Sequence, residues 1–530
     1  MVNAFRVDGK GVRNSRSARE PNRRRRIGLL VGAAGFVALL FTASPAGLDS
    51  TGWRTAAVAT LMATWWVTEA IPIPATALVP LALFPLLGIG SIDVAAAPYA
   101  HPIIFLFLGG FIVALAMERW GLPRRIALNT LRRLGTRPAA LVAGMMASSA
   151  LLSMWVSNTA TAMIMLPIGL AVVELYGSAK AAAEAGGAAA RAAGGGNADP
   201  ASLASGAQES GPNFGIGVML GVAYGCSIGG LGTLIGTPPN AFLAAFLEES
   251  YGVEIGFAEW MLVGFPLVLV GLPLTHLLLT RVVFPLPSQP IPAASELIAG
   301  EIRKLGGMTR PERRVAVVFV ATALLWIARP LIARHLPGLS DAGIAMLAAL
   351  ALFLVPAGAA RGGALMTWVA ARRLPWGMLV LFGGGLSLAS AFGRTGLTDW
   401  IGAGVSSLAA WPVVLVVLAS AGLVIFLTEL TSNTATAAAF LPVLGAVAVG
   451  MGESPLLLAV PAALAASCAF MLPVATPPNA IVYGSGLVTI PHMARAGLLL
   501  NLLFLLLVTA AARLLLPFVF GVALAAGGGP

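Results

Sequence analysis

An internal repeat constrains the fold of this chain more than any other feature of its sequence. The segment Ser157–Ala162 recurs without change as Ser432–Ala437, 275 residues later. The same offset relates Phe107 to Phe382, Gly109-Gly110 to Gly384-Gly385, Gly121-Leu122 to Gly396-Leu397 and Leu166-Pro167 to Leu441-Pro442. A constant offset over about 60 residues indicates two halves of related structure.

A second motif is also present in both halves. The segment Thr237–Ala241, with the sequence Thr-Pro-Pro-Asn-Ala, recurs as Thr476–Ala480 at an offset of 239 residues. The offset is 36 residues shorter than the first one, which matches an additional segment at 176–212 of the first half. That segment is rich in Ala and Gly and has no apolar face, a composition typical of solvated linkers. We expect a flexible loop insertion there.

The remainder of each half is too apolar for a soluble protein. Of the 530 residues, 58% are hydrophobic and 10% are charged, whereas soluble globular proteins carry roughly 25% charged residues. Lipid must therefore be the solvent for most of the chain, which excludes an ordinary soluble enzyme. We predict an all-α polytopic membrane protein with about 11 transmembrane helices. Two re-entrant hairpins, at 138–175 and 413–451, complete this prediction.

The placement of basic residues predicts the orientation of the two halves. Residues 1–26 carry nine Lys/Arg against two acidic residues, and such a cluster before the first apolar run is typical of a cytoplasmic flank rather than of nucleic-acid binding. The segment 119–137 carries six arginines, whereas the equivalent 394–412 carries only Arg394 and Asp399. The positive-inside rule then predicts a cytoplasmic N-terminus and two repeats of inverted orientation. We expect the protein in the inner membrane and expect no nucleic-acid partner.

The repeated motifs have a chemistry suited to binding ions. A polar break between apolar helices exposes N–H groups that attract anions and carbonyl groups that ligate cations. Asn, Ser and Thr side chains add neutral donors and acceptors, and the two prolines leave preceding carbonyl groups free. These features predict a pocket for a small anion together with Na+. The alternative, that Ser, Asn and Thr only cap or cross-link helices, fits a single motif better than two identical copies.

Other functional classes find less support in the sequence. Gly225–Gly229 satisfies the G-x-S-x-G pattern but lies in an apolar segment without His and Asp partners, and Gly229–Gly232 lacks the lysine of a phosphate-binding loop. A channel would need a continuous polar pore. We therefore predict a transporter rather than an enzyme. The roles of two intramembrane acidic residues stay open. Glu69 is functional or lies at the membrane interface, and Glu429 supports the second motif or relays a proton.

Together with Trp65–Thr76, the paired motifs resemble the divalent anion:sodium symporter family over about residues 50–520. The resemblance implies a homodimeric elevator transporter with scaffold and transport domains, which carries di- or tricarboxylates or sulfate. The implied divisions are a cytoplasmic N-terminus (1–26), a first scaffold part (27–137), a first transport part (138–284, with a broken helix at 213–250), a cytoplasmic connection (285–312), a second scaffold part (313–412) and a second transport part (413–530).

The resemblance also implies the ligands of two sodium sites and of the substrate. The first sodium site would use Ser153, Ser157, Asn158 and the loop around Gly236, with Gly232 as a competing ligand, and the second Thr428, Asn433 and Ala475. The substrate would touch Asn158, Thr159, Ser432, Asn433, Thr434, Thr476 and Pro477.

The implied function is Na+-coupled import of a C4 dicarboxylate such as succinate, malate or fumarate, without an organic cofactor. A hydroxyl group at both Ser153 and Thr428, 275 residues apart, favours sodium as the coupling ion. The alternatives are a sodium-independent dicarboxylate exchanger and a sulfate or citrate carrier of the same fold.

Overall fold

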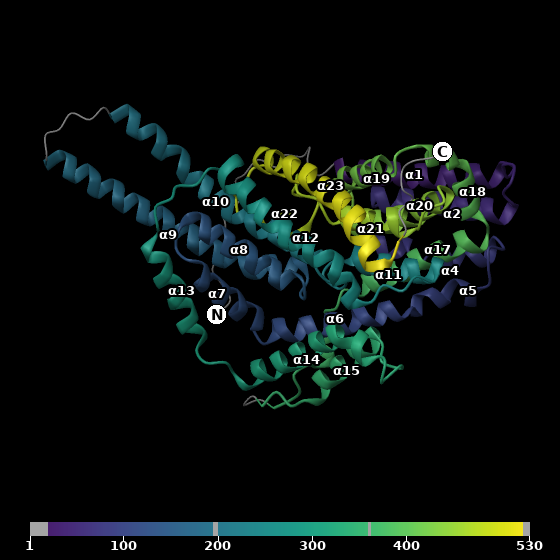
Figure 1. Cartoon of the computed structure of the whole chain (residues 1–530), viewed down its shortest axis with the longest axis horizontal. Coiled ribbons are helices and arrows are strands. Elements are labelled where there is room, and N and C mark those ends of the chain that lie inside the picture. The colour runs from purple at the N-terminus through teal and green to yellow at the C-terminus, as the bar shows by residue number, and fades with distance from the viewer. Residues whose placement is uncertain (1–19, 194–199, 359–361, 523–530) are drawn as a thin grey trace.

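The computed structural model describes residues 20–193, 200–358 and 362–522. Within these ranges the protein is helical and has no strand, apart from one isolated bridge between Pro356 and Ala364. Eight helical stretches of this described part are long and apolar enough to cross a membrane. The helices form an elongated bundle from which α9 and α10 extend at one end (Figure 1). The all-α prediction is therefore confirmed, together with membrane-spanning character.

The two repeats form matching helix pairs. In the first half, α8 (Pro138–Ser153) and α9 (Asn158–Ala193) form a hairpin, followed by α10 (Pro200–Gly230) and α11 (Pro238–Tyr251). In the second half, α19 (Val413–Thr428) and α20 (Asn433–Gly450) form the hairpin, followed by α21 (Leu456–Ala466) and α22 (Pro477–Tyr483). Each Ser-Asn-Thr motif lies where its hairpin turns, and each Thr-Pro-Pro motif restarts a broken helix.

Local chemistry explains where the broken helices restart. Thr237 and Thr476 are extended N-cap residues with φ of −136° and −139°, and two prolines follow each of them. Proline fits the first turn of a helix because the N–H group that it lacks would have no partner there. The backbone N–H of Asn479 donates to the Thr476 hydroxyl at 3.3 Å. The motif therefore starts a helix and leaves the residues before it unwound.

The prediction of a loop at 176–212 is wrong for the described residues. Helix α9 continues to Ala193 and α10 begins at Pro200, so the described residues on both sides of 194–199 are helical. Alanine has the highest intrinsic helix propensity, and the lack of an apolar face predicts only that a helix is not packed in a core. Residues 194–199 lie outside the described part of the chain.

The remaining helices complete the bundle. Their bounds are α1 (Glu20–Phe41), α2 (Ser50–Thr68), α3 (Ile73–Thr76), α4 (Val79–Leu86), α5 (Ile92–Ala96), α6 (Pro102–Arg119), α7 (Leu122–Leu134), α12 (Phe257–Leu277), α13 (Pro292–Leu305), α14 (Arg310–Ile332), α15 (Asp341–Leu354), α16 (Trp368–Ala371), α17 (Trp376–Arg394), α18 (Leu397–Gly404) and α23 (Ile490–Phe520). Short 3-10 turns occur at Ala97–Ala100 and Ser406–Ala410, and a π turn at Leu278–Val283.

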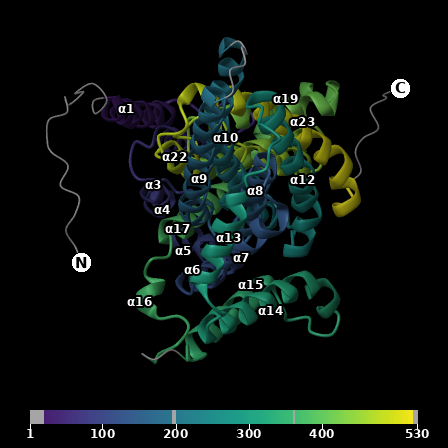
Figure 2. The ribbon, with the colours of Figure 1, turned by 90° about the vertical axis from the view of Figure 1, so that its left-hand side faces the viewer.

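The interior of the bundle lies around the broken helices. The stretch Asn213–Gly230 of α10 is 94% buried, whereas α14 is 22% buried, so α10 belongs to the core and α14 to the periphery. Helices α14 and α15 form a layer along one side of the bundle (Figure 2). Helix α8 packs along α10, where glycines allow close contact: a methyl carbon at Gly229 would lie 2.3 Å from the carbonyl oxygen of Ala150. This packing fixes the first hairpin against the first broken helix.

The repeated Gly-Gly pairs also allow two helices to approach other backbone segments. A methyl carbon at Gly109 of α6 would lie 2.6 Å from the Ala345 carbonyl oxygen of α15. At the equivalent Gly384 of α17, the methyl carbon would lie 2.2 Å from the Ala77 carbonyl oxygen. Backbone atoms cannot move aside as a flexible side chain can. The repeat therefore conserves space for packing at these positions, not a polar function.

We expect Gly109→Val and Gly384→Val to lower the unfolding temperature and the yield of monodisperse protein, because overpacking a core costs about 1–3 kcal/mol or more. The control is Gly393→Ala, since no atom lies within 4 Å of the added methyl group. Fluorescence-detected size exclusion with a thermal ramp measures both quantities. Wild-type behaviour of both valine variants would contradict the packing role.

Candidate functional site

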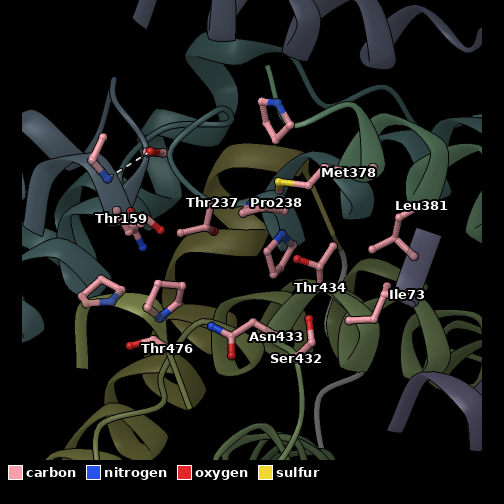
Figure 3. A pocket seen from close by; sticks show the side chains of 18 of the residues that line it. Ile73, Thr159, Thr237, Pro238, Met378, Leu381, Ser432, Asn433, Thr434 and Thr476 are labelled. Carbon is pink, nitrogen blue, oxygen red and sulfur yellow. Dashed lines mark hydrogen bonds between the residues drawn. The ribbon is translucent and has the colours of Figure 1, made fainter. Parts of the chain in front are cut away.

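The turns of both hairpins and the ends of both broken helices line one cavity of about 1010 Å³. In Figure 3, Thr159 and Thr237 lie on one side of this cavity, and Ser432 and Asn433 lie across from them. The lining residues from the repeated motifs and the positions directly before them are Ser157, Asn158, Thr159, Ala160, Gly236, Thr237, Pro238, Pro239, Ser432, Asn433, Thr434, Ala475, Thr476, Pro477 and Pro478. Segments separated by more than 300 residues of sequence thus meet at one place.

The first hairpin turn is held by its own polar side chains. The Ser153 hydroxyl donates to Asn158 Oδ1, and Ser153 is fully buried. The Ser157 hydroxyl accepts from the Ala160 N–H at 3.2 Å and so caps the first turn of α9. The Thr233 hydroxyl donates to the Met154 carbonyl, which joins the first broken helix to this turn. Ser157 and Asn158 line the cavity, while Ser153 lies behind them.

The second hairpin turn repeats the hydroxyl–asparagine contact. The Thr428 hydroxyl donates to Asn433 Oδ1 at 2.7 Å and lies 2.9 Å from the Ala466 carbonyl oxygen. Thr428 is fully buried behind Asn433, as Ser153 is behind Asn158. Both residue pairs that the sequence relates by the 275-residue offset are therefore in contact. Each places an asparagine amide at the cavity wall and a hydroxyl group behind it.

The two repeats also contact each other directly. The hydroxyl groups of Thr237 and Ser467 lie 3.0 Å apart, although 230 residues separate them. Ser467 directly follows α21, so the unwound segment of each half touches that of the other. Of the two glycines considered as ligands, Gly236 lines the cavity, whereas Gly232 is not among its lining residues.

The remaining cavity wall is apolar on one side and charged elsewhere. Ile73, Met378 and Leu381 form an apolar face opposite Thr159 (Figure 3). The charged lining residues are Arg24, Arg25, Glu69, Glu118 and Arg373. Arginines are the majority, so the cavity has a small excess of positive charge that favours anions.

Arg24 also joins two parts of the structure. Its guanidinium donates to the carbonyl oxygen of Val67 at 2.8 Å and to that of Leu430 at 3.0 Å. Val67 lies in the last turn of α2, which ends where Glu69 adopts a left-handed conformation with φ of 49°; it is the single non-glycine residue of the described chain with positive φ. Glu69 is exposed. The basic N-terminal segment thus reaches the second hairpin turn, a contact that its charge pattern did not predict.

Glu429 is the most thoroughly hydrogen-bonded acid of the described chain. Its carboxylate accepts from the backbone N–H groups of Phe470, Met471 and Leu472 at 2.7 to 3.0 Å and from the Asn501 amide at 2.8 Å. The side chain is 3% exposed. These contacts match the supporting role that the sequence left open for Glu429, because they hold the unwound segment before Thr476. Asn501 of α23 carried no sequence signal.

A cavity that lies at the ends of broken helices and is built from two structural repeats is typical of secondary transporters. Comparison with known proteins gives the family. The sequence pattern of the sodium:sulfate symporter transmembrane region matches residues 24–521. The chain therefore belongs to this family, which confirms the resemblance to the divalent anion:sodium symporters.

Individual relatives are similar over nearly the whole chain. The sodium-dependent dicarboxylate transporters SdcS of Staphylococcus saprophyticus and Staphylococcus aureus are each 40% identical over 500 residues, which are 94% of this chain and 92% of theirs. Among solved structures, the antimetabolite efflux pump MtrF of Neisseria gonorrhoeae is similar with a TM-score of 0.50 and 13% identity, covering 96% of both chains. At that identity the similarity concerns the fold alone.

We expect Glu429→Ala to lower the unfolding temperature by more than about 5 °C, because each buried donor left without a partner costs about 1–3 kcal/mol. Glu429→Gln keeps one acceptor oxygen and should lower it less. Glu174→Gln, at an exposed position of α9, is the control. Thermal unfolding of the purified protein measures the order, and equal unfolding temperatures for all three variants would contradict the supporting role.

Proposed function

We propose that this protein imports a small divalent anion, a C4 dicarboxylate such as succinate, malate or fumarate, together with Na+. The observation that carries the proposal is the pair of hairpin turns, each with a buried hydroxyl group behind an asparagine, facing one cavity. The 40% identical relatives named as sodium-dependent dicarboxylate transporters support the choice of substrate and ion.

Charge balance supplies a physical reason for coupling. The repeated motifs offer neutral oxygens and N–H donors only, so they solvate a dianion without neutralising it. Burying an uncompensated charge is costly, and a nearby opposite charge reduces that cost. Sodium ions beside the substrate would supply positive charge at the motifs themselves, in addition to the small positive excess of the charged residues elsewhere in the cavity wall. In this proposal, sodium is needed for the dianion to bind, and the sodium gradient drives its import.

The proposed ligands follow the repeat. One sodium ion is bound by Ser153, Ser157, Asn158 and the backbone near Gly236, and a second by Thr428, Asn433 and Ala475. The substrate contacts Asn158, Thr159, Ser432, Asn433, Thr434, Thr476 and Pro477. All of these residues except Ser153 and Thr428 line the cavity. Those two lie directly behind the asparagines and donate to them.

The proposed mechanism is alternating access by an elevator movement. Helices α8 and α19 have 16 residues each, about 24 Å at 1.5 Å per residue, which is short of a hydrocarbon core of about 30 Å. This length supports hairpins whose first arm stops short of the opposite side of the membrane, and on this basis we propose that both hairpins are re-entrant. We further propose that the protein spans the inner membrane eleven times, has a cytoplasmic N-terminus and forms a homodimer. In this proposal, residues 138–284 and 413–530 form the mobile transport domain, and residues 27–137 and 313–412 form the scaffold domain.

Two alternatives share this fold. A sulfate carrier is favoured by the name of the family, which refers to sodium:sulfate symport. A sodium-independent exchanger would use the same cavity without the cation sites. Uptake of radiolabelled succinate into proteoliposomes separates them. Symport requires an inward sodium gradient and no internal substrate; exchange ignores sodium and requires internal succinate. Uptake of labelled sulfate but not of succinate would show that the transported anion is sulfate rather than a C4 dicarboxylate.

We expect Asn158→Ala and Asn433→Ala each to reduce sodium-driven succinate uptake to background while the protein stays folded, because each asparagine faces the cavity and contacts a buried hydroxyl group. The control is Asn129→Ala, since Asn129 of α7 donates within its own helix, to Arg125, and does not line the cavity. Proteoliposome uptake and size exclusion measure the two properties. Normal uptake by both variants would contradict the site.

A further inference from the structure

The asparagines of the two Thr-Pro-Pro-Asn motifs have a role that the proposed binding site does not include. Asn240 and Asn479 are fully buried, and neither lines the cavity, although the residues directly before each of them do. They therefore lie one layer behind the proposed ligands. Their symmetric positions call for a function that both halves need.

Each asparagine amide bridges two carbonyl groups of the unwound segment that precedes it. Asn240 Nδ2 donates to the Gly230 oxygen at 3.1 Å and to the Thr233 oxygen at 2.9 Å. Asn479 Nδ2 donates to the Ala469 oxygen at 3.2 Å and to the Leu472 oxygen at 3.0 Å. The partners lie ten and seven residues before the asparagine in both cases. The same bridge is thus built twice.

Backbone chemistry explains why the bridge is needed. Carbonyl groups at the end of a helix lose their intrahelical partners, and the prolines that follow have no N–H group to offer. In lipid no water replaces these bonds, so a donor must come from the protein. An asparagine amide supplies two donors from one position. It closes the unwound segment into a loop of fixed shape.

The orientation of each amide follows from its neighbours. Two carbonyl oxygens within hydrogen-bonding distance require the NH2 group, and the amide oxygens of Asn240 and Asn479 have no hydrogen-bond partner within the described part of the chain. The two side chains are therefore held by their donors. An aspartate at either position would have the same shape and would place an oxygen against two carbonyl oxygens.

We propose that Asn240 and Asn479 are positioning residues for the two sodium sites, one for each site. Asn240 holds the segment 231–237, which presents the backbone near Gly236 to the first ion. Asn479 holds the segment 468–476, which presents the backbone near Ala475 to the second. This inference rests on the proposed function, because it assigns both loops to sodium binding. Neither asparagine contacts the ion or the substrate itself.

The test measures sodium binding without transport. The unfolding temperature of the purified full-length protein is recorded against NaCl concentration, with choline chloride keeping the ionic strength constant and no substrate present. Asn240→Asp and Asn479→Asp are compared with Asn129→Asp, which changes an asparagine outside both loops. Loss of a residue that orients metal ligands costs about 10- to 100-fold in metal affinity. We expect the dissociation constant for sodium, obtained from the rise of the unfolding temperature with NaCl, to increase at least about tenfold in both loop variants.

A second measurement separates positioning from a general loss of structure. Sodium dependence of succinate uptake in membrane vesicles, with Asn240→Ser and Asn479→Ser, does not require a protein that withstands purification. The serine variants should need at least about tenfold more sodium for half-maximal uptake, a larger change than that of their KM for succinate at saturating sodium. A general defect would lower maximal uptake without changing the sodium concentration that gives half-maximal uptake, and that result would overturn the inference.

The outcomes distinguish this inference from the proposed function. If sodium does not stabilise the wild-type protein and does not drive its uptake, the proposed function fails. If sodium stabilises the wild-type protein and drives uptake, and the loop variants have the same sodium affinity as the wild type, the positioning role of the asparagines is wrong while the proposed function stands.

Discussion

The pairing of backbone polar groups in an apolar environment is the constraint on which the rest of this structure depends. Each of the two halves interrupts a helix at a place where lipid could not satisfy the exposed N–H and carbonyl groups. Buried side chains supply the partners: the Asn240 and Asn479 amides for carbonyl groups, and the Glu429 carboxylate for three consecutive N–H groups. The interruptions thereby become loops of fixed shape beside the cavity.

The two repeats solve this problem with a common part and a different part. The hydroxyl–asparagine contacts at the hairpin turns and the asparagine bridges of the loops occur in both halves. Glu429 has no counterpart, because the equivalent position in the first half is Met154, whose carbonyl accepts from Thr233. The second loop is therefore held by a buried carboxyl group and the first by amide and hydroxyl groups. The two sides of the cavity are thus related by the repeat but are chemically different.

The class of the protein and the main elements of the site could be predicted from local patterns. Hydropathy predicts membrane-spanning helices, and the two offsets identify the motifs that line the cavity. The same reasoning missed the helical character of the segments next to 194–199, because the absence of an apolar face was taken to exclude a helix. It also missed Asn501 and Ser467, since nothing in their immediate sequence marks them as partners of Glu429 and Thr237.

The sequence by itself therefore determined the membrane environment, the duplication and the positions where helices break, since these depend on composition, periodicity and the missing N–H groups of proline. Only the tertiary structure decided which groups meet at those breaks. The contact between Arg24 and the Leu430 carbonyl joins residues 406 positions apart, and that between Glu429 and Asn501 joins residues 72 positions apart. Such pairs arise from the packing of whole helices, which no local pattern encodes.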